Sequence, residues 1–406
     1  MAKGHLVVSV FVDTVATPLA GAHVNISGEN TNIDLTTDES GKTSVIELEA
    51  PDQEYTQNPQ SEVQPFSTYN IAVTKEGLGM STVLGVQVYS GVVSFQNVFL
   101  STIPGESGKN TTVITPPTIW ENSPPKIVED ANMMNGNAKV LPKVIVPGYI
   151  IVHDGIPSDT YAPNYYVTFS DYIKNVASSE IYPTWPRETL KANVHAIVSF
   201  TLNRVYTEWY FSKGYNFTIT SSTAYDQKYT HNRNIFDTIS NVVDEIFMEY
   251  LQFPGRNYPF FAQYSDGINV VREGWLSQWG SKSLGDQGYN SLQIVRYYYG
   301  NTIELVDAEI VPNLPTSFPG NDLKEGDCGE AIRLLQNALN KIRGSYPAIP
   351  IIRNANGIFD ADTVAAVRKF QSVFNIPVTG IVNFATWYRI SAIFVAVSNM
   401  LKGIFQ

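Results

Sequence analysis

The fold is decided by the stretch Asn175-Val176-Ala177-Ser178-Ser179-Glu180-Ile181-Tyr182-Pro183-Thr184-Trp185-Pro186-Arg187-Glu188-Thr189-Leu190-Lys191-Ala192. Two helical patterns meet in it. The first runs from Ser170, a suitable N-cap residue, to Glu180. Pro186 suits the first turn of the second helix, because the N–H group that proline lacks has no partner there. The apolar side of the second helix is formed by Leu190, Val194, Ile197, Val198 and Val205.

Glu180 closes the apolar stripe of the first helix. It lies at helical spacing from Ile173, Val176 and Ala177. Its carboxyl group should therefore point toward the core, beside Ile181, and not toward solvent. An apolar environment disfavours the charged form of a carboxyl group and can keep it protonated as an acid. The alternative is an ordinary surface carboxylate at a helix end, and the stripe argues against it.

The same stretch resembles the signature of a known family. Residues 179–192 follow the pattern Ser-Glu-x-x-Pro-x-Trp-Pro-x-Glu-x-Leu-Lys-Ala. This pattern is similar to that of the sporulation protein D (SpoIID) family of peptidoglycan lytic transglycosylases. The resemblance implies that Glu180 is catalytic. The sequence departs from the family at Ile181, where Met is usual, and at 193–195, where Asn-Val-His replaces Gln-Ala-Val.

The resemblance implies a mechanism with one carboxyl group. Ordinary glycosidases use two carboxylates, whereas lytic transglycosylases do not use water as the nucleophile. Glu180 would protonate the oxygen that leaves C1 of N-acetylmuramic acid. It would then accept the proton of the C6 hydroxyl, so that a 1,6-anhydro ring closes, which requires a pKa near the working pH. Asp226 is the candidate second carboxylate if the reaction is hydrolysis, and structural roles are expected for Glu188 and His195.

Composition limits the class of partner. A chain of 406 residues suggests two or three domains. Only 16% of its residues are charged and the formal net charge is −11, which argues against nucleic acid, because phosphate binding requires a basic face. A glycan remains compatible, and the 23 Tyr, 20 Phe and 6 Trp suit it.

The cysteine and histidine content predicts no metal site and no cofactor. A single cysteine, Cys328, excludes an intramolecular disulfide and a zinc site with several cysteines. We expect Cys328 to be a small buried filler. His5 and His23 lack partner ligands at zinc spacing and are expected to be ordinary strand residues.

The N-terminal sequence predicts neither a secretory signal nor a membrane span. The apolar run Leu6 to Val12 is too short for a signal h-region. No window reaches 18 apolar residues. If the target is peptidoglycan, we expect another route to it, such as synthesis in the mother cell around a forming spore.

Residues 1–100 predict a small antiparallel β-sandwich. Apolar and polar residues alternate in short runs separated by turn signals. The expected strands are 6–12, 22–26, 44–48, 69–74, 84–88 and 93–100. The run Pro18-Leu19-Ala20-Gly21-Ala22-x-Val24 with Thr37-Asp38-x-x-Gly41 resembles prealbumin-like modules.

Residues 101–142 predict a linker that carries a maturation site. Gly, Pro, Ser, Thr and Asn dominate, without periodicity. From Val146-Pro147-x-Tyr149 onward the chain resembles the clostridial spore cortex-lytic enzymes, which are zymogens activated when a germination serine protease removes an N-terminal segment. We therefore expect a cut between residues 125 and 145, near Lys139-Val140-Leu141. A passive tether is the alternative.

The central domain, residues 143–311, is expected to form the glycan groove. The polar segment 218–227 would line it beside Glu180, because hydroxyl and amide groups suit sugar hydroxyls. The segment Gly274-Trp275-Leu276-Ser277-Gln278-Trp279-Gly280 resembles a second family signature, with Glu273 where the family has His. Further helices are expected over 235–250 and over 289–299, the latter ending at Gly300. The expected substrate-binding residues are Trp185, Ser221, Ser222, Tyr225, Gln227, Tyr264 and Gln278.

After a linker at 312–322, residues 323–406 predict a helical module. One expected helix contains Leu334-Leu335-Gln336 and another contains Phe370-Gln371, and Asp-Gly-like turns separate the helices. The pattern resembles the three-helix peptidoglycan-binding domain. Capping is expected at Asp360 or Asp362 and at Asn383. The apolar run 390–405 is expected to be a last helix that packs on another domain.

Together these expectations describe a multidomain α+β zymogen. It has an N-terminal β-sandwich, a central mixed α/β catalytic domain of the sporulation protein D type and a C-terminal three-helix wall-binding domain. The expected substrate is spore-cortex peptidoglycan, outside the cytoplasm in the cortex and coat region. The alternatives are an N-acetylmuramidase, a non-catalytic wall-binding protein that stimulates an amidase, and a phage or tailocin wall-piercing component.

Overall fold

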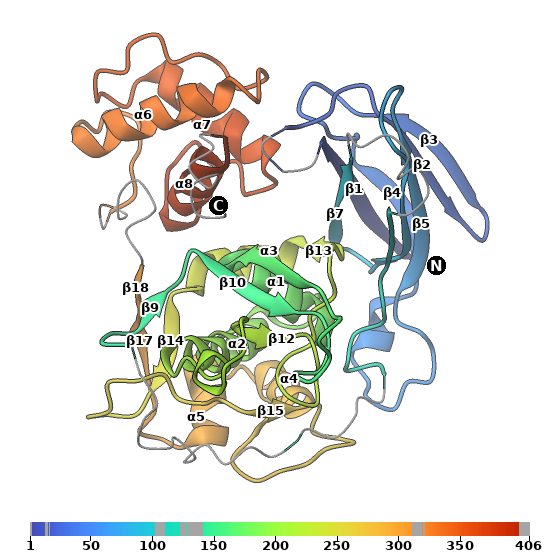
Figure 1. Cartoon of the computed structure of the whole chain (residues 1–406), viewed down its shortest axis with the longest axis vertical. Helices are drawn as coiled ribbons and strands as arrows, with labels where there is room; N and C mark the ends of the chain where they lie inside the picture. Colours follow the sequence, from blue (N-terminus) through green and yellow to red (C-terminus); the bar gives the residue numbers. More distant parts are fainter. Residues whose placement is uncertain are drawn as a thin grey trace.

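The computed structural model describes residues 2–12, 15, 17–101, 110–121, 127, 141–310, 319 and 321–397. Figure 1 shows three units: a β unit formed by the N-terminal strands, a central unit of helices and short strands, and a C-terminal helical unit beside the β unit. The α+β class is as the sequence predicts. Most of the expected maturation region, 125–145, lies outside the described residues.

The β unit consists of two sheets that enclose one apolar core. The first has the order β13-β7-β1-β4, in which β1 (Ala2–Val12) runs parallel to β7 (Val93–Leu100) and antiparallel to β4 (Ile46–Ala50). The second has the order β3-β2-β5-β6-β8. Its strands are β3 (Thr31–Thr36), β2 (His23–Gly28), β5 (Ser67–Thr74), β6 (Ser81–Val88) and β8 (Asn110–Val113). The alternation that predicted the strands directs one face of each sheet into the core.

Three strands in these sheets are absent from the sequence prediction. β3 is an edge strand with few buried residues. β8 comes from the expected linker and pairs in parallel with β6. β13 (Ile235–Phe236) belongs to the central unit but pairs with β7. β8 and β13 are too short to show an alternation, whereas β3 does alternate, with Ile33 and Leu35 between polar residues, and the prediction missed it.

The central unit is built on the two helices that meet at Glu180. α1 (Phe169–Glu180) begins after Thr168, whose hydroxyl accepts from the backbone N–H of Asp171 at 3.3 Å. The expected N-cap at Ser170 is therefore wrong by two residues, because Thr168 has the extended backbone of a cap. α2 (Arg187–Tyr206) begins after Pro186, as the sequence predicts, and is buried on most sides.

Short elements surround this helix pair. β10 (Tyr149–His153) lies between β11 (Asn164–Thr168) and β12 (Ile219–Thr220), and α3 (Asp237–Ile246) packs against α1 and α2. The expected helix over 235–250 is thus shorter than its apolar stripe. The remaining elements are β9 (Ile145–Val146), η2 (Phe211–Lys213), β14 (Glu249–Gln252), β15 (Tyr264–Ser265), β16 (Leu276–Ser277), α4 (Gln278–Asp286), α5 (Ser291–Tyr299), β17 (Glu304–Asp307) and β18 (Glu309–Ile310).

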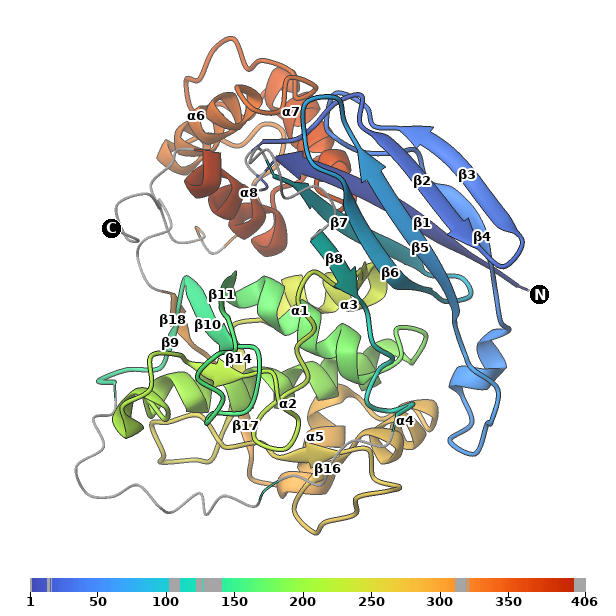
Figure 2. The ribbon, with the colours of Figure 1, turned by 45° about the vertical axis from the view of Figure 1, so that its right-hand side comes forward.

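The C-terminal unit contains α6 (Glu330–Arg343), α7 (Ala361–Val373) and α8 (Phe384–Val397). Asp360 caps α7 and Asn383 accepts from Thr386 N–H, as the sequence predicts. α8 packs on α3, and Figure 2 shows this unit against both other units. Cys328 is exposed in the loop before α6, so the prediction of a buried filler is wrong. Only its backbone pairs, with Ile358.

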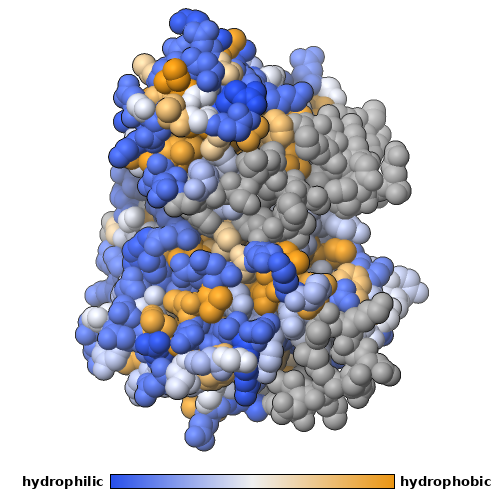
Figure 3. Space-filling view, turned by 90° about the vertical axis from the view of Figure 1, so that its left-hand side faces the viewer, coloured by the Kyte–Doolittle hydropathy of each residue, from blue (hydrophilic) through white to orange (hydrophobic). Residues whose placement is uncertain are grey.

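The surface carries scattered apolar side chains. On the face in Figure 3, small hydrophobic patches alternate with hydrophilic residues. The described residues with large exposed apolar side chains include Tyr161, Val271 and Tyr297. Within the described part of the chain, every helix is too short or too polar to span a membrane.

Candidate active site

Glu180 is buried at the C-terminal end of α1, with 2% of its surface exposed. Its Oε1 accepts a hydrogen bond from the backbone N–H of Lys228 at 2.9 Å. Burial and the Glu180 carboxylate both raise the pKa of the Tyr264 phenol well above its usual range. The carboxyl group is therefore held by a backbone donor and faces a neutral phenol, and a proton-transfer group needs such a fixed position.

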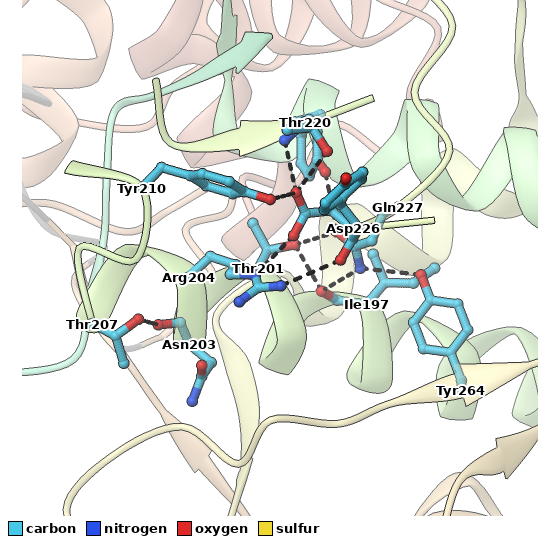
Figure 4. Close-up of polar contacts among 12 residues, drawn as sticks. Ile197, Thr201, Asn203, Arg204, Thr207, Tyr210, Thr220, Asp226, Gln227 and Tyr264 are labelled. Atoms are coloured by element: carbon cyan, nitrogen blue, oxygen red, sulfur yellow. Dashed lines mark hydrogen bonds and ion pairs between the residues drawn. The ribbon is translucent and has the colours of Figure 1, made fainter. Parts of the chain in front are cut away.

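Gln227 fixes the orientation of Tyr264. Its amide N–H donates to the Tyr264 hydroxyl at 3.1 Å and to the backbone oxygen of Ile197 at 3.2 Å. Its amide oxygen accepts from Tyr172 at 3.1 Å and from Thr201 at 2.8 Å. All of these groups are buried, so the network places the Tyr264 hydroxyl with little freedom. Figure 4 shows Gln227 between α2 and Tyr264.

Asp226, the candidate second carboxylate, is fully buried and bonded on both oxygens. Oδ1 accepts from Arg204 Nε at 2.8 Å. Oδ2 accepts from the Tyr210 hydroxyl at 2.6 Å and from the Thr220 backbone N–H and hydroxyl at 2.9 and 2.7 Å. Figure 4 shows these bonds gathered on one side chain. Asp226 therefore anchors the loop that leads to Lys228.

A segment of the N-terminal part of the chain covers the end of α1. We call residues 114–121 the strap. The backbone N–H of Thr118 donates to Ser179 O at 2.9 Å, and the Thr118 hydroxyl lies 3.4 Å from Glu180 O. Ile119 and Trp120 pack against the central core. In Figure 2 the teal chain after β8 runs down along the central unit. The strap therefore lies directly over the residues that end in Glu180.

Both ends of the strap are attached. At its start, Ile114 N–H donates to Leu84 O at 2.9 Å, and Gln87 Nε2 donates to Thr115 O at 2.9 Å. At its end, the ammonium of Lys228 donates to Pro116 O at 2.5 Å and to Glu121 Oε2 at 3.1 Å. These contacts join the β unit to the candidate active site.

A polar cavity of about 520 Å³ lies between this N-terminal segment and the central unit. One side is formed by β8, Thr115 and Glu121. The other side consists of Asp154, Tyr165, Ser221, Ser222, Thr223, Lys228, Tyr229, Thr230 and His231. Hydroxyl, imidazole, carboxylate and ammonium groups on one concave surface can bind a polar, hydroxyl-rich ligand.

The structure brings only part of the expected binding set to this cavity. Ser221 and Ser222 line it, and Tyr225 is half-buried in the same loop. Tyr264 and Gln227 lie behind Glu180 as positioning groups. Gln278 is buried at the start of α4. Trp185 is buried too, and its indole N–H donates to Thr56 O of the β unit at 2.9 Å.

Glu188 and His195 have structural partners. Glu188 Oε2 accepts from the backbone N–H of Ser291 at 2.7 Å, at the start of α5. A carboxylate there favours the helix N-terminus. His195 is buried on α2 with its Nε2 2.9 Å from Glu249 Oε2. These contacts support structural roles for both residues, although the contact of Glu188 is with the start of α5 and not with its own helix.

Sequence reasoning missed several groups that line the cavity, among them Tyr165, Lys228 and His231. Tyr165 and His231 stack with ring centroids 3.5 Å apart and 5° between planes. Burial lowers the pKa of His231 to about 4, although Asp154 opposes this shift. His231 is therefore neutral at neutral pH. The signal available was weak, because Lys228 and His231 belong to no motif that we recognised.

Among the residues described, no group of three or more His, Cys, Asp or Glu is arranged to hold a metal ion.

Comparison with known proteins identifies the C-terminal unit. Residues 328–390 match the family described as "Putative peptidoglycan binding domain". The match covers α6, α7 and the first half of α8. A peptidoglycan-binding domain at this position supports a cell-wall-associated protein, located outside the cytoplasm, with peptidoglycan as a partner.

The other comparisons contribute no functional information. No curated protein matches the chain. Among solved structures, a type II cohesin–X-dockerin complex from Acetivibrio cellulolyticus, a C-terminal interface mutant, is similar at 14% identity over 24% of this chain, with a TM-score of 0.16. The chain spans about half (53%) of that structure's chain. A score this low carries no argument.

Proposed function

We propose that this protein is the zymogen of a lytic transglycosylase that cleaves the glycan strands of spore-cortex peptidoglycan during germination. The observation that carries the proposal is the placement of Glu180: it is buried, it accepts from the backbone N–H of Lys228, a residue that lines the polar cavity, and it is covered by the strap. The peptidoglycan-binding domain supports the substrate class. The strap supports latency, because it belongs to the part of the chain that a cut between residues 125 and 145 would separate.

The chemistry follows from the residues around Glu180. As an acid, Glu180 gives its proton to the glycosidic oxygen that leaves C1 of N-acetylmuramic acid. The C6 hydroxyl of the same sugar then attacks C1 and returns a proton to Glu180. The bond between C1 and the leaving oxygen breaks, and the 1,6-anhydro bond forms without water. The fixed backbone donor from Lys228 stabilises the carboxylate form between the two steps.

The state of Asp226 favours this reaction over hydrolysis. An inverting or retaining hydrolase needs a second free carboxylate near the scissile bond. Asp226 is occupied by Arg204, Tyr210 and Thr220. On the described central unit, the cavity is lined by one carboxylate, that of Asp154. An N-acetylmuramidase using Glu180 and Asp154 is therefore the second candidate.

The test uses the full chain before and after limited proteolysis by a germination serine protease. Peptidoglycan sacculi are digested and the products are weighed by mass spectrometry. We expect 1,6-anhydro ends only after proteolysis, and a loss of about 10²–10⁴-fold with Glu180→Gln. Glu309→Gln, which breaks an exposed ion pair with Lys143, is the matched control.

Three other outcomes contradict the proposal. Reducing ends that disappear with Asp154→Asn indicate the hydrolase. Equal activity of the uncut chain and of the cut chain after its β unit has separated contradicts the zymogen assignment. A wall effect that Glu180→Gln leaves intact indicates a non-catalytic wall-binding protein, which the C-terminal domain alone would explain.

A further inference from the structure

Lys228 contacts the candidate active site and the strap at the same time. Its backbone N–H holds Glu180 Oε1 at 2.9 Å. Its ammonium reaches the other way, to Pro116 O and to Glu121 Oε2. The Lys228 side chain is 14% exposed, whereas that of Glu121 is 44% exposed. Lys228 therefore contacts two carboxylates: that of Glu180 through its backbone, and that of Glu121 in the strap through its ammonium group.

The ammonium of Lys228 lies where an anion is needed. Burial lowers its pKa, and the neighbouring Arg233 acts in the same direction, while Glu121 opposes both. A poorly hydrated cation is costly unless an anion or several hydrogen-bond acceptors pair with it. In the intact chain the strap supplies both, through Glu121 and Pro116. Once the strap leaves, the same ammonium needs a replacement.

The cavity next to Lys228 can hold that replacement. Its volume of about 520 Å³ lies within the usual range of ligand sites, about 300–1,000 Å³. Glu121 and Lys228 both line it, and the hydroxyl groups of Ser221, Ser222 and Thr223 share its wall. Because the segment 111–121 forms the opposite wall, its departure would open the cavity to a long polymer while the hydroxyl groups and the ammonium stay in place.

We propose that the Lys228 ammonium is a carboxylate-binding subsite for the glycan, and that Glu121 of the strap occupies this subsite in the intact chain. The inference rests on the proposed function, because it names the part of the substrate that the site recognises. Peptidoglycan offers carboxylates from two sources: the lactyl group of muramic acid without a stem peptide, and the stem peptide itself. Binding through Lys228 would place either one beside the bond on which Glu180 acts.

Direct binding to the full chain tests the subsite without any cleavage. Calorimetry measures N-acetylmuramic acid, which has a free lactyl carboxylate, and a muramoyl dipeptide, whose carboxylate is peptidic. We expect Glu121→Gln to bind one of these about fivefold more tightly than the unchanged chain, the effect of removing a half-exposed ion pair. Lys228→Gln should abolish the gain. The probe that responds identifies the source of the carboxylate.

Matched controls separate the subsite from general effects. Glu309→Gln removes an exposed ion pair with Lys143, and Lys282→Gln removes the ion pair with Asp286 on α4. Neither should change binding of the two probes. Lys228→Gln keeps the backbone N–H that holds Glu180, so a folded variant is expected, and its melting temperature checks this.

Kinetics after activation give a second readout. With soluble glycan strands, Lys228→Gln should raise KM about tenfold, the usual effect of losing a hydrogen bond to a charged group, with kcat changed less than about twofold. Glu121→Gln should raise the activity of the uncut chain about fivefold, and leave that of the activated chain unchanged.

The outcomes distinguish this inference from the proposed function. If Glu180→Gln remains active but Lys228→Gln abolishes probe binding, the subsite holds and the reaction assignment fails. If neither probe responds to Glu121→Gln or Lys228→Gln, while Glu180→Gln is inactive, the subsite is refuted and the reaction stands. If Lys228→Gln lowers kcat and leaves KM unchanged, Lys228 only positions Glu180.

Discussion

Replacing Asp226 by Asn distinguishes an anchor from a catalytic carboxylate. Asp226 is fully buried and accepts four hydrogen bonds, one of them from Arg204, which is 2% exposed. An amide of the same shape removes the charge that neutralises Arg204. The NH₂ group of Asn also takes the place of one carboxylate oxygen. At that position all neighbouring groups are hydrogen-bond donors, so the NH₂ group finds no acceptor there. The change therefore damages a buried network without altering its volume.

The magnitude follows from burial. Removing one partner of a buried ion pair costs about 3–5 kcal/mol, because the other charge remains uncompensated. The aromatic rings near Arg204, with Trp209 at 4.6 Å and Phe261 at 4.8 Å from its guanidinium carbon, offset part of this cost. We expect about 3 kcal/mol in the free energy of unfolding. For a domain of 150–250 residues this lowers Tm by roughly 10 °C.

Differential scanning calorimetry of the full chain measures the effect, with glycan cleavage after proteolysis as the second readout. Activity per folded molecule should stay within about threefold of the unchanged protein at a temperature where both are folded, because positioning damage is smaller than loss of a catalytic carboxylate. Glu309→Gln, at an exposed ion pair, should change stability by less than about 1 kcal/mol. An unchanged Tm together with lost cleavage would refute the anchor role and identify Asp226 as catalytic.

Three further changes have defined outcomes. Since burial lowers the folded-state pKa of His231 from 6.5 to about 4, the unfolded chain binds the proton first, and stability should fall by on the order of 2 kcal/mol between pH 6.5 and 4; His231→Gln should flatten this part of a denaturation profile against pH. Gly267→Ala should cost at least about 2 kcal/mol in urea unfolding, because φ is +79° and the new Cβ would lie 2.5 Å from Ser277 Cβ. Asp360→Ala removes the N-cap bond from Thr363 N–H and should destabilise the C-terminal unit by about 1 kcal/mol in the same assay, whereas no change would show that α7 needs no cap.

The elements with strong apolar periodicity were predictable from sequence. α1, α2 and the longer strands of the β unit lie within a few residues of their expected ranges. Their periodicity exists because each buries one face against a large core. A last helix over 390–405 that packs on another domain was also expected, since a mostly apolar helix must be covered; α8 spans Phe384–Val397 and packs on α3. The N-cap of α1 was not expected, because Ser and Thr are both favoured N-cap residues and residue type alone ranks Ser170 above Thr168.

The candidate site was predictable only at its centre. The apolar stripe placed Glu180 inside, and the structure has it buried. Its partners were not predictable, because Lys228 contributes a backbone N–H, which any residue has. Gln227 and Tyr264 were expected to face the glycan, yet a polar side chain gives no sign in the sequence of whether it meets a ligand or another buried side chain. Trp185 and Gln278 are buried, and their assignment to the groove remains a prediction.

The strap belongs to the predicted linker, 101–142, and its contacts could not be predicted from composition. β8, which precedes the strap, is short, and the strap contains Pro116 and Pro117, so neither shows periodicity and the sequence predicts a linker. The strap is held by hydrogen bonds to distant parts of the chain: to Lys228, to the end of α1 and to Leu84 of β6. The β unit is held in the same way, through the pairing of β13 with β7 and through Trp185 donating to Thr56. A cut between residues 125 and 145 breaks the chain but none of these contacts. Under the proposed function, activation by such a cut therefore requires a second step, in which the β unit separates from the central unit and takes the strap with it.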